Sequence, residues 1–107
     1  MTSKLEIPSE ILQAAELRFS TRITGFLWQP FPHGWSLAGE LYGDLSGRFE
    51  EGGMIQTSPV MELRWEHGYA LALTFSDSRY VLVQPADNWD EKLNKLFIHE
   101  APQGSED

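Results

Sequence analysis

Side chains alternate with a period of two in two runs, 61–66 and 69–75, and the apolar run YVLV follows at 80–83. Leu63 and Trp65 alternate with charged neighbours, and Tyr69 begins a second alternation that continues to Phe75. This period is typical of half-buried strands. Two short polar turns, Glu-His-Gly and Ser-Asp-Ser, divide the segment. The pattern predicts a three-stranded meander over 60–83, with Tyr69 and Phe75 on the same face of the sheet.

Three further strands are predicted before the meander, because residues 21–28, 36–42 and 54–58 are rich in apolar and β-branched side chains. The intervening segment QPFPHGW (29–35) contains two prolines and a glycine, and we expect it to interrupt the sheet. Gly39 lies inside a predicted strand, where glycine often marks a bulge or a close approach of two backbones.

A helix is predicted near each end of the chain, over 9–19 and over 88–98, from apolar positions that recur with a helical period. Ser9 and Asn88 are expected to cap them. The predicted fold is α+β: five to six antiparallel strands with one helix near each terminus. We expect a single domain over residues 1–107, with 1–8 and 101–107 frayed.

Composition narrows the range of functions. Hydrophobic residues make up 41% of the chain, there is no cysteine, and no apolar run is long enough to span a bilayer. These features predict a cytoplasmic protein without disulfides. The net charge of −8 disfavours direct binding to nucleic acid or to anionic membranes, and favours a protein partner with a basic surface. We expect a monomer or a weak dimer.

No catalytic or cofactor motif is recognisable. The three histidines are separated from one another by more than thirty residues and show no metal-ligand spacing, so neither a metal nor a cofactor is expected. No serine lies in a nucleophile elbow, and the glycine-rich stretch around residues 43–53 lacks the residues of a phosphate loop. The sequence therefore predicts a protein that is not an enzyme.

Two groups of residues are candidates for binding a partner. Phe31, His33 and Trp35 lie together in the segment of prolines and glycine, where exposed aromatic side chains would form a binding hot spot. The alternative is that they pack as a small satellite core beneath that loop. Five acids form the second group, and for these the alternative is a contribution to solubility alone: Glu40, Asp44, Glu50, Glu51 and Asp77.

The segment GRFEEGGMIQTSPVMEL, followed by ALALTFSDSRYVLV, resembles small uncharacterised proteins of bacteriophages and prophages. The shared pattern is Gly-Arg-Phe, a glycine, Thr-Ser-Pro-Val and a later Tyr-x-Leu. The matching residues are Gly47, Arg48, Phe49, Gly53, Thr57, Ser58, Pro59, Val60, Tyr80 and Leu82. The resemblance implies an anti-CRISPR-like role and no catalytic residue. From the residues themselves we expect a scaffold: Phe49 in the core, a tight turn at Gly52-Gly53, and hydroxyl groups that satisfy the backbone around Pro59.

Three hypotheses follow. The first is a small acidic, non-enzymatic inhibitor or regulator that binds a nucleic-acid-binding host defence complex, either by mimicry of nucleic acid or by docking on a basic patch. The second is a small-ligand module with an aromatic pocket that includes Phe31 and Trp35. The third is a small hydrolase with paired carboxylates, one of which has a raised pKa.

Overall fold

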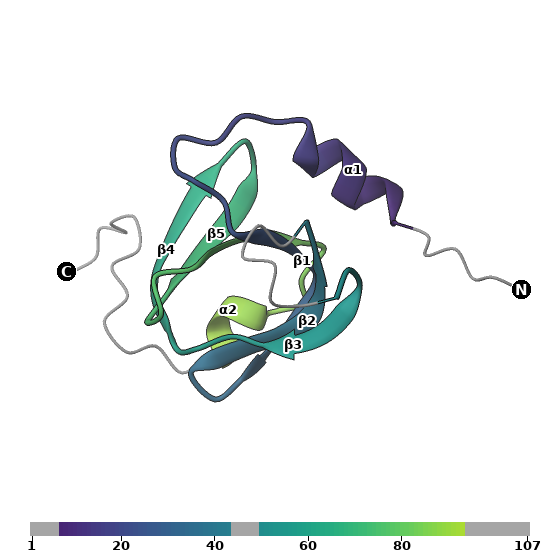
Figure 1. Ribbon diagram of the computed structural model, residues 1–107. Helices are drawn as coiled ribbons and strands as arrows, with labels where there is room; N and C mark the ends of the chain where they lie inside the picture. Colours follow the sequence, from purple (N-terminus) through teal and green to yellow (C-terminus); the bar gives the residue numbers. More distant parts are fainter. Residues whose placement is uncertain (1–6, 44–49, 94–107) are drawn as a thin grey trace, which may run out of the picture.

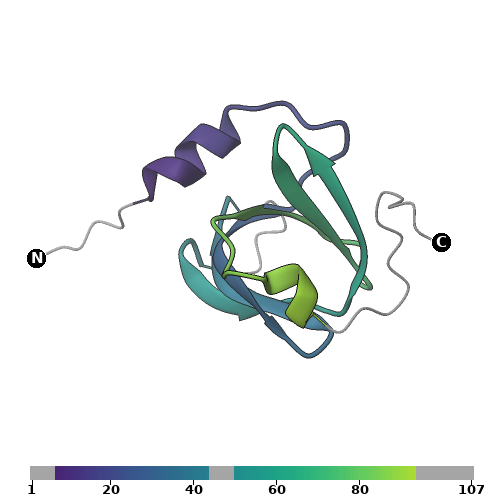
Figure 2. The ribbon, with the colours of Figure 1, turned by 180° about the vertical axis from the view of Figure 1, so that it is seen from behind.

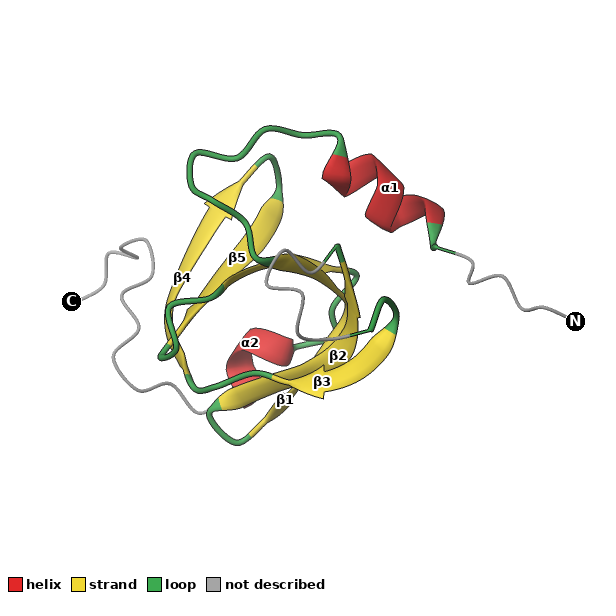
Figure 3. Cartoon of the chain, in the orientation of Figure 1, coloured by secondary structure: helices red, strands yellow, loops and turns green. Residues whose placement is uncertain are grey.

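The computed structural model describes residues 7–43 and 50–93 of the 107-residue chain. The expectations for Asp44, Gly47, Arg48 and Phe49, for frayed ends over 1–6 and 101–107, and for a helix over 94–98 lie outside the described residues. Strands dominate the structure (Figure 3). In chain order the elements are α1 (Ser9–Ala15), β1 (Gly25–His33), β2 (Ser36–Tyr42), β3 (Gly53–Gln56), β4 (Val60–Glu66), β5 (Tyr69–Thr74), β6 (Arg79–Val83) and α2 (Trp89–Lys92).

The six strands form one mixed sheet in the order β3-β2-β1-β6-β5-β4. Each half of the sheet is an antiparallel meander, and the meander predicted over 60–83 is confirmed. The two halves meet where β1 pairs with β6 in parallel, from Gly25 opposite Tyr80 to Trp28 opposite Val83. The prediction of an entirely antiparallel sheet is therefore wrong. The direction of this pair depends on how two distant meanders meet, which the alternation within each strand does not encode.

Strand β1 continues through the prolines that we expected to interrupt it. Its register with β2 shifts between Trp28 and Phe31, and Gln29 adopts a left-handed φ of 51°. This bulge takes Pro30, which has no N–H to donate, out of the regular ladder and into a fully buried position. Gly39 faces the bulge: a Cβ there would lie 3.1 Å from the Pro30 Cα. The prediction of a close approach at Gly39 is confirmed.

The sheet curls around α2, so its concave face encloses one apolar core (Figures 1 and 2). Leucines from the strands, among them Leu27, Leu41 and Leu82, pack there with Trp89 and Leu93. A second apolar layer covers the convex face, where α1 contacts β1 and β6. The second layer consists of Ile11, Ala14, Tyr42, Leu71, Val81 and Val83. Burial on both faces explains why β5 and β6 carry almost continuous apolar sequences.

Both helices are shorter than predicted. The first ends at Ala15 rather than at residue 19, and Pro8, not Ser9, occupies its N-cap position. The second is a single turn of four residues that ends where Leu93 becomes extended. Asn88 does occupy the N-cap position of α2, but it has left-handed backbone angles and its side chain makes no capping hydrogen bond. Packing of Trp89 and Leu93 into the concave core, rather than helix propensity, positions this turn.

The segment between α1 and β1 is attached to the β4–β5 hairpin. The Glu66 carboxylate accepts hydrogen bonds from the Ser20 N–H, at 2.9 Å, and from the Ser20 hydroxyl. These bonds favour the charged carboxylate and lower the pKa of Glu66, the hydroxyl contributing most. The His67 ring donates from Nε2 to the Arg18 carbonyl at 2.7 Å. Together the two contacts hold the entry to β1 against the far end of the sheet.

Candidate functional site

Three connecting segments converge at one end of the curled sheet: the β1–β2 turn, the β3–β4 link and the β5–β6 turn. The Val60 N–H donates to the Trp35 carbonyl at 2.7 Å, and the Phe75 N–H donates to the Pro59 carbonyl at 2.8 Å. These two bonds bring Trp35 and Phe75 to the same end of the molecule. Phe31 projects from β1, which leads into the first of the three segments. We call Phe31, Trp35 and Phe75 the aromatic rim.

Two hydroxyl groups hold the β3–β4 link in place. The buried Thr57 Oγ1 accepts the Leu37 N–H at 3.0 Å and donates to the Ser58 carbonyl at 2.7 Å. The Ser58 Oγ accepts the Ser76 N–H at 3.0 Å. The prediction that these hydroxyls satisfy backbone groups around Pro59 is confirmed, and so is the tight turn, where Gly52 has a φ of 81°. The β3–β4 link, which lies between the segments of Trp35 and Phe75, is therefore hydrogen-bonded to β2 on one side and to the β5–β6 turn on the other.

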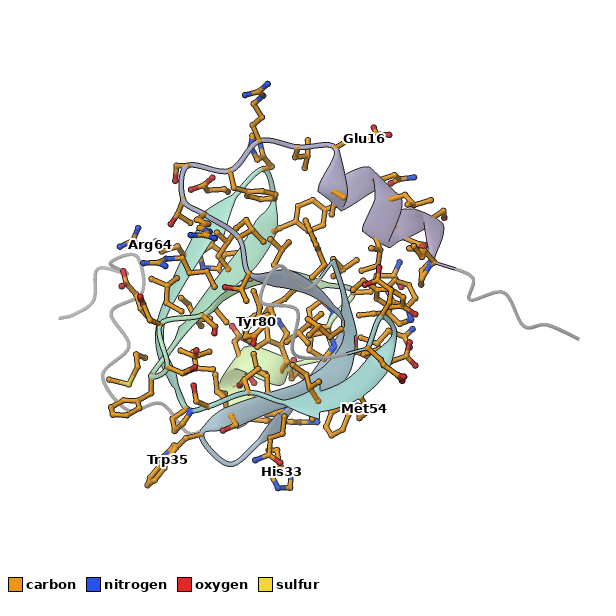
Figure 4. All side chains as sticks on the ribbon, in the orientation of Figure 1. Glu16, His33, Trp35, Met54, Arg64 and Tyr80 are labelled. Atoms are coloured by element: carbon orange, nitrogen blue, oxygen red, sulfur yellow. The ribbon has the colours of Figure 1, made fainter. Side chains whose placement is uncertain are left out.

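The rim residues present large apolar surfaces to solvent. Trp35 is 50% exposed, Phe31 is 43% exposed and Phe75 is 72% exposed. In Figure 4, Trp35 and the exposed His33 project away from the body of the protein, on the side opposite Glu16. Of the two interpretations of this loop, the exposures favour a binding surface over a satellite core, in which the rings would be buried.

Phe75 was assigned to the wrong environment from sequence. Its place in the alternation that begins at Tyr69 predicted a strand residue, but β5 ends at Thr74. The chain then turns, with Thr74 accepting the Asp77 N–H and donating its own N–H to Ser78. The Ser-Asp-Ser sequence directly after Phe75 was the available signal, because such residues favour turns. A turn that begins one residue earlier places the ring outside the sheet.

The predicted acidic residues do not form one group. Asp77 lies in the β5–β6 turn beside the rim, where its exposed carboxylate is 3.4 Å from the Arg79 guanidinium. Glu50 and Glu51 lie near the opposite end of β2, because the next residue, Gly52, bonds to the Leu41 carbonyl. Strand β2 has seven residues, so its two ends, and the acidic residues near them, are roughly 20 Å apart.

Several carboxylates have local structural partners. Glu51 Oε1 accepts the Gly43 N–H at 2.8 Å, and Glu40 accepts the Tyr42 hydroxyl at 3.1 Å. Burial, and then the hydrogen bond to Glu40, raises the pKa of Tyr42. Glu50, by contrast, is exposed. The described acids are therefore distributed along the chain and partly engaged in holding turns, so we base the functional argument on the aromatic rim.

The hydrolase hypothesis requires a carboxyl group with a raised pKa. The hydrogen bonds to Ser20 shift the pKa of Glu66 in the opposite direction. No three His, Asp or Glu side chains within residues 7–43 and 50–93 are grouped so that they could hold a metal ion. No helix in the described parts of the chain has both the length and the apolar character that crossing a membrane requires.

Comparisons with protein families, with curated proteins and with solved structures gave no match to this chain. The resemblance to phage proteins therefore stays a prediction.

Proposed function

We propose that this protein is a non-enzymatic binding module that docks its aromatic rim onto a basic protein surface. The observation that carries the proposal is that backbone hydrogen bonds hold the segments of Trp35 and Phe75 together at one end of the sheet, with both side chains at least half exposed and Phe31, on the adjoining strand, 43% exposed. Aromatic side chains dominate the energetics of protein interfaces, and rigid ones lose little conformational entropy on binding.

The exposed area is large enough to drive association. An aromatic side chain buries 150–250 Å² when it is fully covered, so covering the exposed half of Trp35 removes about 100 Å² from water. At about 25 cal/mol per Å², that contributes roughly 2.5 kcal/mol. Phe75, which is 72% exposed, offers a similar amount. A few such side chains supply most of the binding energy in many protein interfaces.

The charge of the chain indicates the class of partner. With a net charge of −8, the protein attracts cationic surfaces and repels anionic ones. Asp77, in the turn that follows Phe75, pairs with Arg79, but its carboxylate is 85% exposed and so is open to a lysine or arginine of the partner as well. A nucleic-acid-binding host defence complex has such a basic surface, and inhibition of one, as an anti-CRISPR protein would do, remains a prediction. Contact through the rim does not require the protein to mimic nucleic acid.

The test compares two tryptophans of equal exposure. Trp35 is 50% exposed and belongs to the rim, whereas Trp65 is 51% exposed and lies on β4. Affinity-tagged wild type, Trp35→Ala, Phe75→Ala and Trp65→Ala would each be incubated with lysate of the source cell. Bound proteins would then be quantified by mass spectrometry at low and at high salt.

We expect one or a few basic proteins that bind wild type and Trp65→Ala equally. Each rim substitution should reduce their recovery about tenfold or more. High salt should lower recovery further, because it screens the attraction between opposite charges. Partners that bind the Trp35→Ala and Phe75→Ala variants as well as they bind wild type would refute the proposal. Circular dichroism would confirm that the variants are folded.

A further inference from the structure

The third strand, β3, forms one edge of the sheet and pairs with β2 along its other side. The Thr57 N–H, one residue beyond β3, donates to the Leu37 carbonyl at 2.8 Å. Since bonded and non-bonded positions alternate along an antiparallel pair, Ile55 also faces β2. The backbone N–H and C=O groups of Met54 and Gln56 then face away from β2. Among residues 7–43 and 50–93, no strand pairs with that side of β3.

The two edges of the sheet differ in composition. Strand β4, the opposite edge, carries Glu62, Arg64 and Glu66, and its register with β5 is interrupted by a bulge. Charges and bulges on edge strands prevent pairing with other chains. Strand β3 has the sequence GMIQ, with no charge and no proline, and Met54 is 63% exposed. The chain therefore protects one edge and leaves the other suited to pairing.

Carboxylates flank this edge. Glu40 lies opposite Met54 in the β2–β3 register, so their side chains share the convex face of the sheet. Glu50 is exposed and lies three residues before β3 begins. A strand with lysine or arginine beside apolar residues would complement both features. A second copy of this chain would instead bring the same carboxylates and a further charge of −8.

We infer that the edge of β3 accepts an extended, lysine- or arginine-containing segment of a partner protein as a seventh strand. Main-chain hydrogen bonds to Met54 and Gln56 give the segment its register, and its apolar side chains cover Met54. Its cationic side chains reach toward Glu40 and Glu50. This contact uses neither Trp35 nor Phe75, so those two rim residues can fail as a binding site while the edge holds, and the reverse.

The test uses a defined probe. A short peptide of alternating lysine and valine would be titrated into the full-length, isotope-labelled protein at millimolar concentration. Its control is the same peptide with alternate backbone nitrogens methylated, which keeps the charge and removes the donors on one side. Amide hydrogen exchange and chemical shifts of Met54, Ile55 and Gln56 would be followed by NMR.

We expect the Met54 and Gln56 amides to gain protection while Ile55, already bonded to β2, changes little. The methylated peptide should bind about tenfold more weakly or worse, because two or more hydrogen bonds are lost. Glu50→Gln should weaken binding a few-fold, whereas Trp35→Ala should leave it unchanged. Three results would each overturn the inference: no gain of protection at Met54 and Gln56, equal binding of both peptides, or occupation of the edge by a second copy in sedimentation measurements.

Discussion

The contact between Gly39 and the β1 bulge gives a sharp test of the packing described above. In Gly39→Ala, the new methyl group would lie 3.1 Å from the Pro30 Cα and 3.2 Å from the Trp28 carbonyl oxygen. Both are closer than ordinary van der Waals contact, and both atoms belong to the backbone of a bulge whose Pro30 is fully buried. No flexible side chain can move aside, so β1 or β2 must shift.

The expected cost follows from two opposing terms. Forcing an additional methyl group into a packed interior typically costs about 1–3 kcal/mol. Replacing glycine by alanine returns roughly 0.4–1 kcal/mol, because it reduces the conformational entropy of the unfolded chain. The net loss in the free energy of unfolding should be about 1–2 kcal/mol. For a domain of this size, that lowers Tm by roughly 5–10 °C. Thermal denaturation followed by circular dichroism would measure it.

Gly68 provides the control, because it isolates backbone strain from steric contact. It has a φ of 83°, and a Cβ there would meet nothing within 4 Å. Asparagine tolerates left-handed backbone angles better than alanine does, so Gly68→Asn should cost less than Gly68→Ala. At Gly39 the order should reverse, since asparagine is larger than alanine. A Gly39→Ala variant as stable as wild type, or the same order at both sites, would refute the assignment of a steric contact.

Two further changes test the hydrogen bonds that hold the molecule together. Thr57→Val should lower the free energy of unfolding, measured in urea, by roughly 1–3 kcal/mol, because it leaves the buried Leu37 N–H without its acceptor. Thr57→Ser keeps the hydroxyl and should cost distinctly less. Equal losses in the two variants would contradict this assignment. Glu66→Gln should lower Tm at neutral pH because it removes the charged acceptor of Ser20. Since the folded-state pKa of Glu66 lies below its ordinary value of 4.5, the difference from wild type should be complete above pH 4.5 and should close as pH falls through the lower value. A difference that does not change on acidification would assign the effect to something other than the carboxylate charge.

Local sequence predicted most of the sheet. Alternation with charged residues indicates β4, whereas β2, β5 and β6, which are buried on both faces, were indicated by their apolar content and by the turn residues between them. The path of β1 could not be read in the same way. Proline is excluded from regular ladders, but the left-handed Gln29 and the absence of a side chain at Gly39 together make room for Pro30. The position of Pro30 therefore depends on residues of both β1 and β2, and the sequence of β1 alone does not predict it.

The candidate site was predicted in part for similar reasons. Trp35 and Phe31 were proposed from composition, and their exposure agrees with a binding surface. Phe75 was missed because the alternation continued one residue beyond the end of β5. Proximity of Trp35 to Phe75 depends on hydrogen bonds to Val60 and Pro59, which join segments far apart in sequence. Such contacts follow from how the sheet curls, and no local pattern specifies them.

The parallel contact between β1 and β6 determines when the chain can finish folding during its synthesis. Gly25 of β1 pairs with Tyr80 of β6, so the ribosome must add more than fifty residues after β1 begins before the two meanders can pair. Until then β1, with Phe26 and Leu27, is an unpaired edge strand that can associate with other nascent chains. Loop-closure entropy over this distance should also make the joining of the halves the slow step. A ribosome-bound chain truncated before β6 should therefore remain sensitive to protease.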